Sequence, residues 1–341
     1  MWRIVLITAF FLAGISSIQA QYSQLEVKNK DTAKKEYPYI FPILGKKAVA
    51  KGFNIPLPAG IMLNTFFGNS DITISNLQLG VEGTNVNVPL TPVEFIEFGK
   101  NTATVKNVNI RPDLWVLPFM NVYGILGYTE GKTSVSLTAP VPFNAVADLK
   151  GYTYGFGTTF AGGVGKYFIV GDFNWAWSAM DILDKPAASS ITSFRFGRNF
   201  QINNQKDKLF GVWAGLMKFK LASGTQGKVT LGDVIPPEVF ARKDEIVADY
   251  YEWYNNLGNN PVDQKKKEIA DKVLTPIVEG IDARDGSTTV SYSLEKKPTK
   301  KWNMIVGGQY QFNKRWQLRT EFGFFGGRSQ GLFSANYRFG L

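Results

Sequence analysis

The sequence predicts an all-β fold, a transmembrane antiparallel β-barrel of about 12 strands (range about 12 to 14), and three observations lead to this prediction. Apolar and polar residues alternate with a period of two along most of the chain after residue 59, which gives a strand one apolar and one polar face. No apolar run after residue 20 is long enough for a membrane-spanning helix, and the mean hydropathy is -0.10, because lipid-facing and lumen-facing residues of a barrel cancel. Aromatic residues make up 14% of the chain and 34 of its 341 residues are glycine, a composition that suits aromatic girdles and close strand packing.

Residues 1–20 are typical of a cleaved signal peptide. They have the charged residue Arg3 near their start, continue through an apolar stretch and end at the small residue Ala20, which is the order of a charged region, an apolar region and a cleavage site. The apolar stretch is shorter than the roughly 18 residues that a membrane-spanning helix needs. Cleavage after Ala20 would start the mature protein at Gln21.

The segment 21–58 has no strand-like alternation and predicts an irregular N-terminal region. Residues 21–36 are polar and indicate a mobile tail. Residues 37–58 are rich in proline and aromatic residues, and proline cannot donate a hydrogen bond to a central strand. Two interpretations remain open for residues 37–58: a lead-in packed near the barrel mouth, or a plug that enters the lumen.

The barrel itself is predicted over residues 59–341. Alternation is clearest in six segments: 151–161, 171–178, 208–221, 302–312, 316–324 and 330–341. It is weaker in eight others: 59–68, 71–82, 102–116, 119–129, 132–141, 189–202, 225–233 and 287–297. Strands of about ten residues cross a bilayer when tilted, and bacterial barrels have an even strand number, so about 12 strands are expected. A soluble β-sandwich would also alternate, but it would not place its aromatic residues on the same parity in strand after strand.

One segment, at about 236–282, breaks the alternation and predicts an inserted two-helix hairpin. Apolar residues recur there at helical spacing, and Asn260 followed by Pro261 predicts the start of the second helix. The hairpin either lies on the membrane or plugs the lumen, aided by the lysines at 265–267, or packs its apolar stripe on the barrel rim. Counting strands back from a periplasmic C-terminus places the hairpin in the periplasm, provided that 287–297 spans the membrane.

The composition excludes several function classes. The chain has no cysteine and no histidine, which removes Ser-His and Cys-His nucleophiles and the commonest metal ligand. No catalytic constellation is found, so we predict that the protein is not an enzyme and has no cofactor and no metal site. The formal net charge of +10 favours outer-membrane lipid, lipopolysaccharide or a small anionic solute as partners over nucleic acid, which an exported chain rarely meets.

The polar faces of the predicted strands supply candidate lumen-lining residues. By parity with their apolar neighbours, they are Asp172, Asn174, Arg195, Lys218, Lys220, Gln309, Arg319, Glu321 and Arg338. A barrel with this lining would favour anions along a solute path. Alternatively, Arg319, Glu321 and Arg338 form a buried ion network that holds a filled interior together, because barrels of about 8 strands are filled by their own side chains.

The closing segment carries a resemblance. Phe333, Tyr337 and Phe339 share one face and Ser334 and Asn336 the other, which resembles the last strand of Gram-negative outer-membrane barrels, read by the barrel-assembly machinery. Residues 56–61, 111–128 and 302–324 are also similar to a family of uncharacterised Gram-negative outer-membrane β-barrel proteins, porin-like or transporter-like.

The resemblance implies a location in the outer membrane of a Gram-negative bacterium and a barrel fold, but no established substrate or catalytic residue. We therefore expect an outer-membrane β-barrel that passes or binds a small anionic or amphipathic solute. The alternative is a structural or interaction barrel that anchors a periplasmic helical hairpin to a partner without transport.

Overall fold

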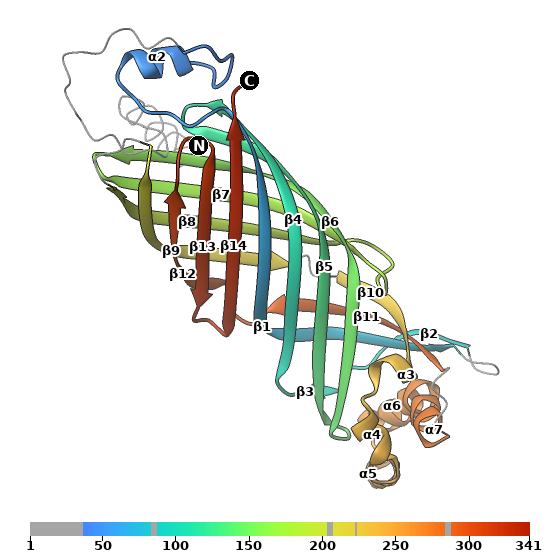
Figure 1. Ribbon diagram of the computed structural model, residues 1–341. Coiled ribbons are helices and arrows are strands. Elements are labelled where there is room, and N and C mark those ends of the chain that lie inside the picture. Colours follow the sequence, from blue (N-terminus) through green and yellow to red (C-terminus); the bar gives the residue numbers. More distant parts are fainter. Residues whose placement is uncertain (1–36, 83–86, 203–206, 222–223, 284–287) are drawn as a thin grey trace, which may run out of the picture.

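A computed structural model describes residues 37–82, 87–202, 207–221, 224–283 and 288–341. The predicted signal peptide and polar tail, residues 1–36, lie outside the described residues. Within those ranges the chain forms an antiparallel closed barrel with 10 strands in the ring and 4 strands outside it (Figure 1).

The ring closes through β1 (Ala59–Glu82), the longest strand. From Ala59 onward β1 pairs with β14 (Arg328–Phe339) on one side and with β4 (Asn101–Leu117) on the other. The remaining ring strands follow in order: β5 (Met120–Ala139), β6 (Phe143–Val164), β7 (Tyr167–Met180), β8 (Ala187–Gln201), β9 (Leu209–Leu221), β12 (Trp302–Gln311) and β13 (Trp316–Phe324).

The expected count of about 12 ring strands is wrong for two physical reasons. Segments 59–68 and 71–82 are one continuous strand, as are 119–129 and 132–141, because β1 and β5 run on beyond the ring. Segments 225–233 and 287–297 form strands outside the ring, since β9 pairs directly with β12. A period of two predicts that a residue belongs to a strand, but not where that strand leaves the barrel.

The strands outside the ring build a projecting layer that we call the extension. The second half of β1 pairs with β11 (Thr289–Pro298) and β2 (Asn87–Pro92), and β11 pairs with β10 (Gly224–Thr230). β3 (Glu97–Phe98) pairs with the end of β5. In Figure 1 these strands and the projecting ends of β5 and β6 lie at the end of the barrel away from the C-terminus.

The helices cover this same end. They are α3 (Leu231–Val234), α4 (Pro237–Ala241), α5 (Lys243–Asn256), α6 (Pro261–Ile269), the π-helical turn η1 (Ala270–Leu274) and α7 (Thr275–Asp282). The Asn260 side chain accepts a hydrogen bond from the Asp263 backbone N–H and so caps α6 as the sequence predicts. No helix in the described part of the chain is long and apolar enough to span a membrane.

The predicted side of the hairpin is wrong. Counting back from the C-terminus places the helices at the C-terminal end only if 287–297 crosses the barrel. β11 instead pairs with the far half of β1, so the helices lie at the opposite end from the C-terminus (Figure 1).

Residues 37–58, which include α2 (Gly45–Ala50), lie at the other end of the ring. The Ile40 N–H donates to the carbonyl of Leu341 at 3.0 Å, and the Trp115 N–H donates to the carbonyl of Pro58 at 2.8 Å. These bonds fasten the segment to strand ends, so it lies at the mouth of the barrel, beside the C-terminus (Figure 1).

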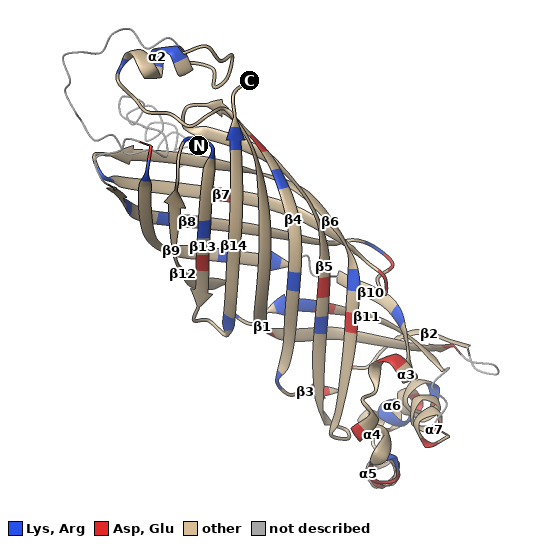
Figure 2. Ribbon diagram, in the orientation of Figure 1, with Lys and Arg blue, Asp and Glu red and all other residues tan. Residues whose placement is uncertain are grey.

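The outer wall of the ring has an apolar band, with charged residues at both edges of this band. Exposed side chains such as Phe156, Phe194 and Leu318 cover this band. Charged residues on the outside gather at its two edges, at Lys106 and Lys150 near the extension and at Arg198 and Arg315 near the C-terminus. Figure 2 shows a change from charged to uncharged strand along β5 and β6, with the charged residues on the side of the extension.

Candidate functional site

The structure brings most of the predicted lumen-lining residues together inside the ring. Asp172, Arg195, Gln309, Glu321 and Arg338 are buried, and Asn174 and Arg319 are partly buried among them.

Two lysines on β9 are the exception. Trp213 and Met217 point inward, with exposed fractions of 6% and 7%, and so Lys218 and Lys220 face outward. Lys218 lies over the Trp302 ring on the outer wall at 5.3 Å. The prediction for these two residues is wrong because the apolar side chains of β9 fill the interior, which inverts the assumed parity.

A buried ion network links four strands across the interior. The Arg195 guanidinium donates to Glu321, with 2.9 Å from Nη2 to Oε1, and its Nη1 donates to Asp172. Glu321 also accepts from the Trp213 indole N–H at 2.8 Å and from Arg319 at 3.2 Å. Because each carboxylate is bound by a charged donor, ionised groups can remain in this buried interior.

A second cluster lies near residues 56–58 and joins the predicted Arg338 to Asp113 and Arg111, which the sequence analysis missed. Arg338 forms a 3.0 Å ion pair with Asp113 and donates to the Leu57 carbonyl at 2.9 Å. Arg111 stacks on the Tyr123 ring at 3.6 Å. The signal for Arg111 and Asp113 was present, since they alternate with the outward residues Ile110 and Pro112 on β4.

The side chains of these clusters occupy the interior of the ring. The space left among Arg111, Asp172 and Arg338 is about 40 Å³, enough for water molecules but not for a solute. Of the two interpretations of the lumen-lining residues, the geometry favours buried ion pairs over an open path, as expected for a barrel not much larger than about 8 strands. The predicted membership differs in one residue, because Arg338 pairs with Asp113 and not with Glu321.

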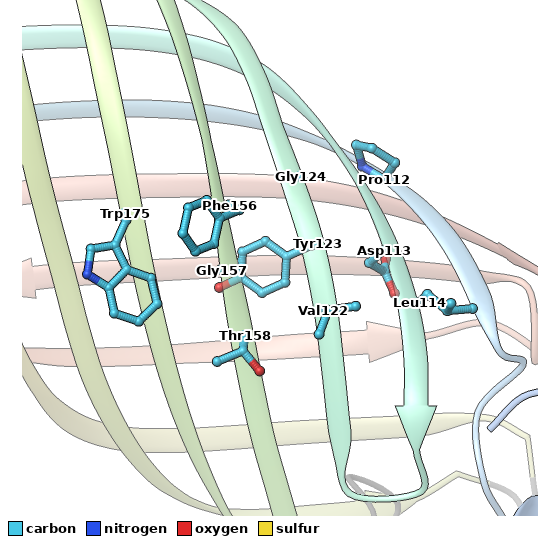
Figure 3. A pocket seen from close by; sticks show the side chains of 10 residues that line it. All are labelled: Pro112, Asp113, Leu114, Val122, Tyr123, Gly124, Phe156, Gly157, Thr158 and Trp175. Atoms are coloured by element: carbon cyan, nitrogen blue, oxygen red, sulfur yellow. The ribbon is translucent and has the colours of Figure 1, made fainter. Parts of the chain in front are cut away.

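A groove of about 550 Å³ runs along the outside of β4 to β7 (Figure 3). Phe156 and Trp175 form one side of it and Pro112 the other. Gly124 leaves the middle open, because a Cβ there would meet only Pro112 at 3.8 Å. The floor is Tyr123, whose ring turns inward over Gly157, where a Cβ would lie 2.5 Å from the ring.

A separate cavity of about 270 Å³ lies inside the extension, beneath the helices. Its wall comes from β1, β11 and β10 and from the projecting ends of β5 and β6, and its roof from α5, η1 and α7. Representative lining residues are Ile74, Val135, Leu149, Ile246, Val278 and Leu294. The helices reach the cavity through one apolar cluster that includes Ile246, Tyr250 and Leu274 and packs against Val141 and Phe143.

The wall of this cavity holds one cation, Lys296, the last of four inward residues on β11 after Val290, Tyr292 and Leu294. Its ammonium donates to the hydroxyl of buried Thr133 at 2.6 Å. No carboxylate of the described residues lies within ion-pair distance of it. Burial alone therefore acts on this group and lowers the pKa of Lys296 to about 8.

The other titratable groups of the cavity wall stay neutral. Burial raises the pKa of Tyr250 and of Tyr292 to about 12, and the Tyr250 hydroxyl is bonded to Thr275 at 2.7 Å. The alternation Val290, Tyr292, Leu294, Lys296 could have revealed Lys296 from the sequence, but only once β11 was known to face a cavity.

Among known proteins, the chain is similar to several solved structures. No protein-family model matches the sequence, and no curated protein matches it. The β domain of the Bordetella autotransporter BrkA is 12% identical, with a TM-score of 0.33, over 83% of this chain and 100% of that chain. OprG from Pseudomonas aeruginosa is 9% identical, with a TM-score of 0.33, over 84% of this chain and 99% of that chain.

The toluene transporter TbuX from Ralstonia pickettii is 9% identical, with a TM-score of 0.28, over 83% of this chain and 90% of that chain. An autotransporter domain, an outer-membrane protein and a transporter are thus among the similar structures.

Within the described ranges, no group of three or more acidic side chains is placed to hold a metal ion. The chemistry that the residues do offer is binding, in an apolar cavity that contains one partly buried lysine without a carboxylate partner.

Proposed function

We propose that this protein is an outer-membrane β-barrel that binds a small hydrophobic or amphipathic molecule in the cavity beneath its helices. In this proposal residues 1–20 are cleaved during export, and the barrel-assembly machinery inserts the chain through β14. The host is a Gram-negative bacterium, and outer-membrane lipid and lipopolysaccharide surround the ring.

The membrane setting is supported by the outer wall. A band of exposed apolar side chains between two charged levels is what a lipid bilayer requires of a barrel, since a charge at mid-bilayer costs roughly 2–4 kcal/mol. A closed ring also leaves no unpaired strand edge in lipid. Lipid chains would then fill the groove beside Trp175 and Phe156.

The cavity is the observation that carries the ligand-binding function. Most binding pockets are concave, mainly apolar and about 300–1,000 Å³ in volume, with a few polar groups. At about 270 Å³ the cavity suits a compact ligand. The filled ring favours binding at this end over free passage through the lumen.

A probe-binding experiment tests the proposal. The full-length protein in lipid nanodiscs is titrated with the uncharged fluorophore N-phenyl-1-naphthylamine. Ala147 lines the cavity, so Ala147→Trp fills it, and we expect at least about a tenfold loss of affinity, because the ring of the probe and the indole cannot share the space.

The matched control is Ala179→Trp, an exposed alanine on the neighbouring strand β7, which is expected to bind the probe as wild type does. Equal probe binding by wild type and Ala147→Trp, with both proteins folded, would contradict the proposed site.

A further inference from the structure

The cavity contains a charge that its own lining does not neutralise. Inside the ring, Arg195 and Arg338 are each paired with a carboxylate. Lys296 has the hydroxyl of Thr133 and apolar neighbours from β1, β5 and β6. Burying an ammonium without a counterion is costly, so such a group usually has a binding partner or a function.

The neighbours of Lys296 on its own strand do not supply the missing anion. Glu295 points to the opposite face and is engaged by Lys297. Across the cavity, β5 presents Thr133, β10 presents Thr225, and the helices present Tyr250, none of which carries negative charge at neutral pH. An anion at this position has to come from a ligand.

We propose that the cavity binds an anionic amphiphile, whose single anionic group is held by the Lys296 ammonium and the Thr133 hydroxyl. This inference rests on the function proposed above and specifies its ligand class. The apolar part of the ligand lies among Val135, Leu294 and Leu149 and extends toward the helical roof. A monoanion matches the site because Lys296 is the one cation among the described lining residues.

Octanoate and octan-1-ol form a suitable pair of probes, because they share a chain and differ in the head group. Binding of each is measured by calorimetry on the full-length protein in nanodiscs, with empty nanodiscs subtracted. Wild type should bind octanoate more tightly than octan-1-ol. Lys296→Met keeps the length of the side chain without its charge and should weaken octanoate binding by at least about tenfold, since a charge-assisted hydrogen bond is lost.

Lys297→Met is the matched control, because Lys297 is exposed and points away from the cavity. It should bind both probes as wild type does. The octanoate affinity of wild type should also fall as the pH rises above about 8, where free Lys296 loses its proton, while octan-1-ol binding stays constant.

The outcomes separate this inference from the proposed function. If Lys296→Met binds octanoate as tightly as wild type does, the assigned role of Lys296 is wrong while the cavity remains a binding site. If wild type binds neither probe and also fails to bind the naphthylamine fluorophore, both the proposed function and this inference are wrong.

Discussion

At the scale of single residues, Lys296, the proposed anion-binding residue, also lowers the stability of the folded protein. Its charged form is disfavoured in the folded protein, because the ammonium lies against apolar side chains of the extension, outside the ten-stranded ring. When Lys296 is protonated in both the folded and the unfolded state, lowering of its pKa from 10.5 to about 8 corresponds to at most about 3.4 kcal/mol of destabilisation, at about 1.36 kcal/mol per pKa unit.

The sign of this effect gives a pH prediction. Below about pH 8 the full penalty is present, and between about pH 8 and 10.5 it disappears as folded Lys296 loses its proton. Lys296→Met should therefore be more stable than wild type at pH 7 and similar to it at pH 10.5. Thermal unfolding of the two proteins, compared at both pH values without ligand, measures this. A stability difference that is independent of pH would contradict the assignment.

At the scale of elements, the helices and the extension depend on one another. Ile246 on α5 is buried in the cluster that joins the helices to Val141 and Phe143. Ile246→Asp would place an unpaired carboxylate there, at a cost of roughly 3–5 kcal/mol. Because the ring does not use this cluster, we expect the helices to detach while the barrel stays folded.

Limited trypsin digestion tests this separation. In Ile246→Asp, cleavage at the lysines of 265–267 should become fast, while the barrel keeps its heat-sensitive shift in electrophoretic mobility. Val262→Asp is the control, since Val262 on α6 is 65% exposed. Resistance to trypsin equal to that of wild type would show that the helices do not need this contact.

The elements also show which parts of the fold could be predicted from the sequence. The alternation of apolar and polar residues identified all ten ring strands, because each strand has one apolar and one polar face. The Asn260 cap located the start of α6. The alternation did not separate the ring from the extension, since β11 has the same period as a ring strand and differs only in the strands with which it pairs. The orientation of Lys218 failed for a related reason, as the Trp213 and Met217 side chains are apolar and yet point inward. Pairing partners and interior packing are properties of the assembled barrel rather than of any one segment.

At the scale of the whole molecule, the side chains inside the ring predict that the barrel does not conduct ions. Arg195, Glu321 and Asp172 cross the interior, and the pocket beside them has a volume of about 40 Å³. Wild-type protein in a planar bilayer should give a conductance indistinguishable from that of a protein-free membrane. The triple variant Asp172→Ala, Arg195→Ala, Glu321→Ala removes both carboxylates together with Arg195, and only Arg319 of this network then lacks its carboxylate partner.

We expect discrete current steps from this triple variant, provided that its heat-sensitive mobility shows a closed barrel, because water would replace the side chains that block the ring. Ohmic steps from wild type with a preference for anions, lost on charge reversal at Arg319 and Arg338, would instead show that solutes pass through the ring. In that case the ion network would rearrange during passage, and the cavity beneath the helices would be an entry site to a path rather than a place of binding.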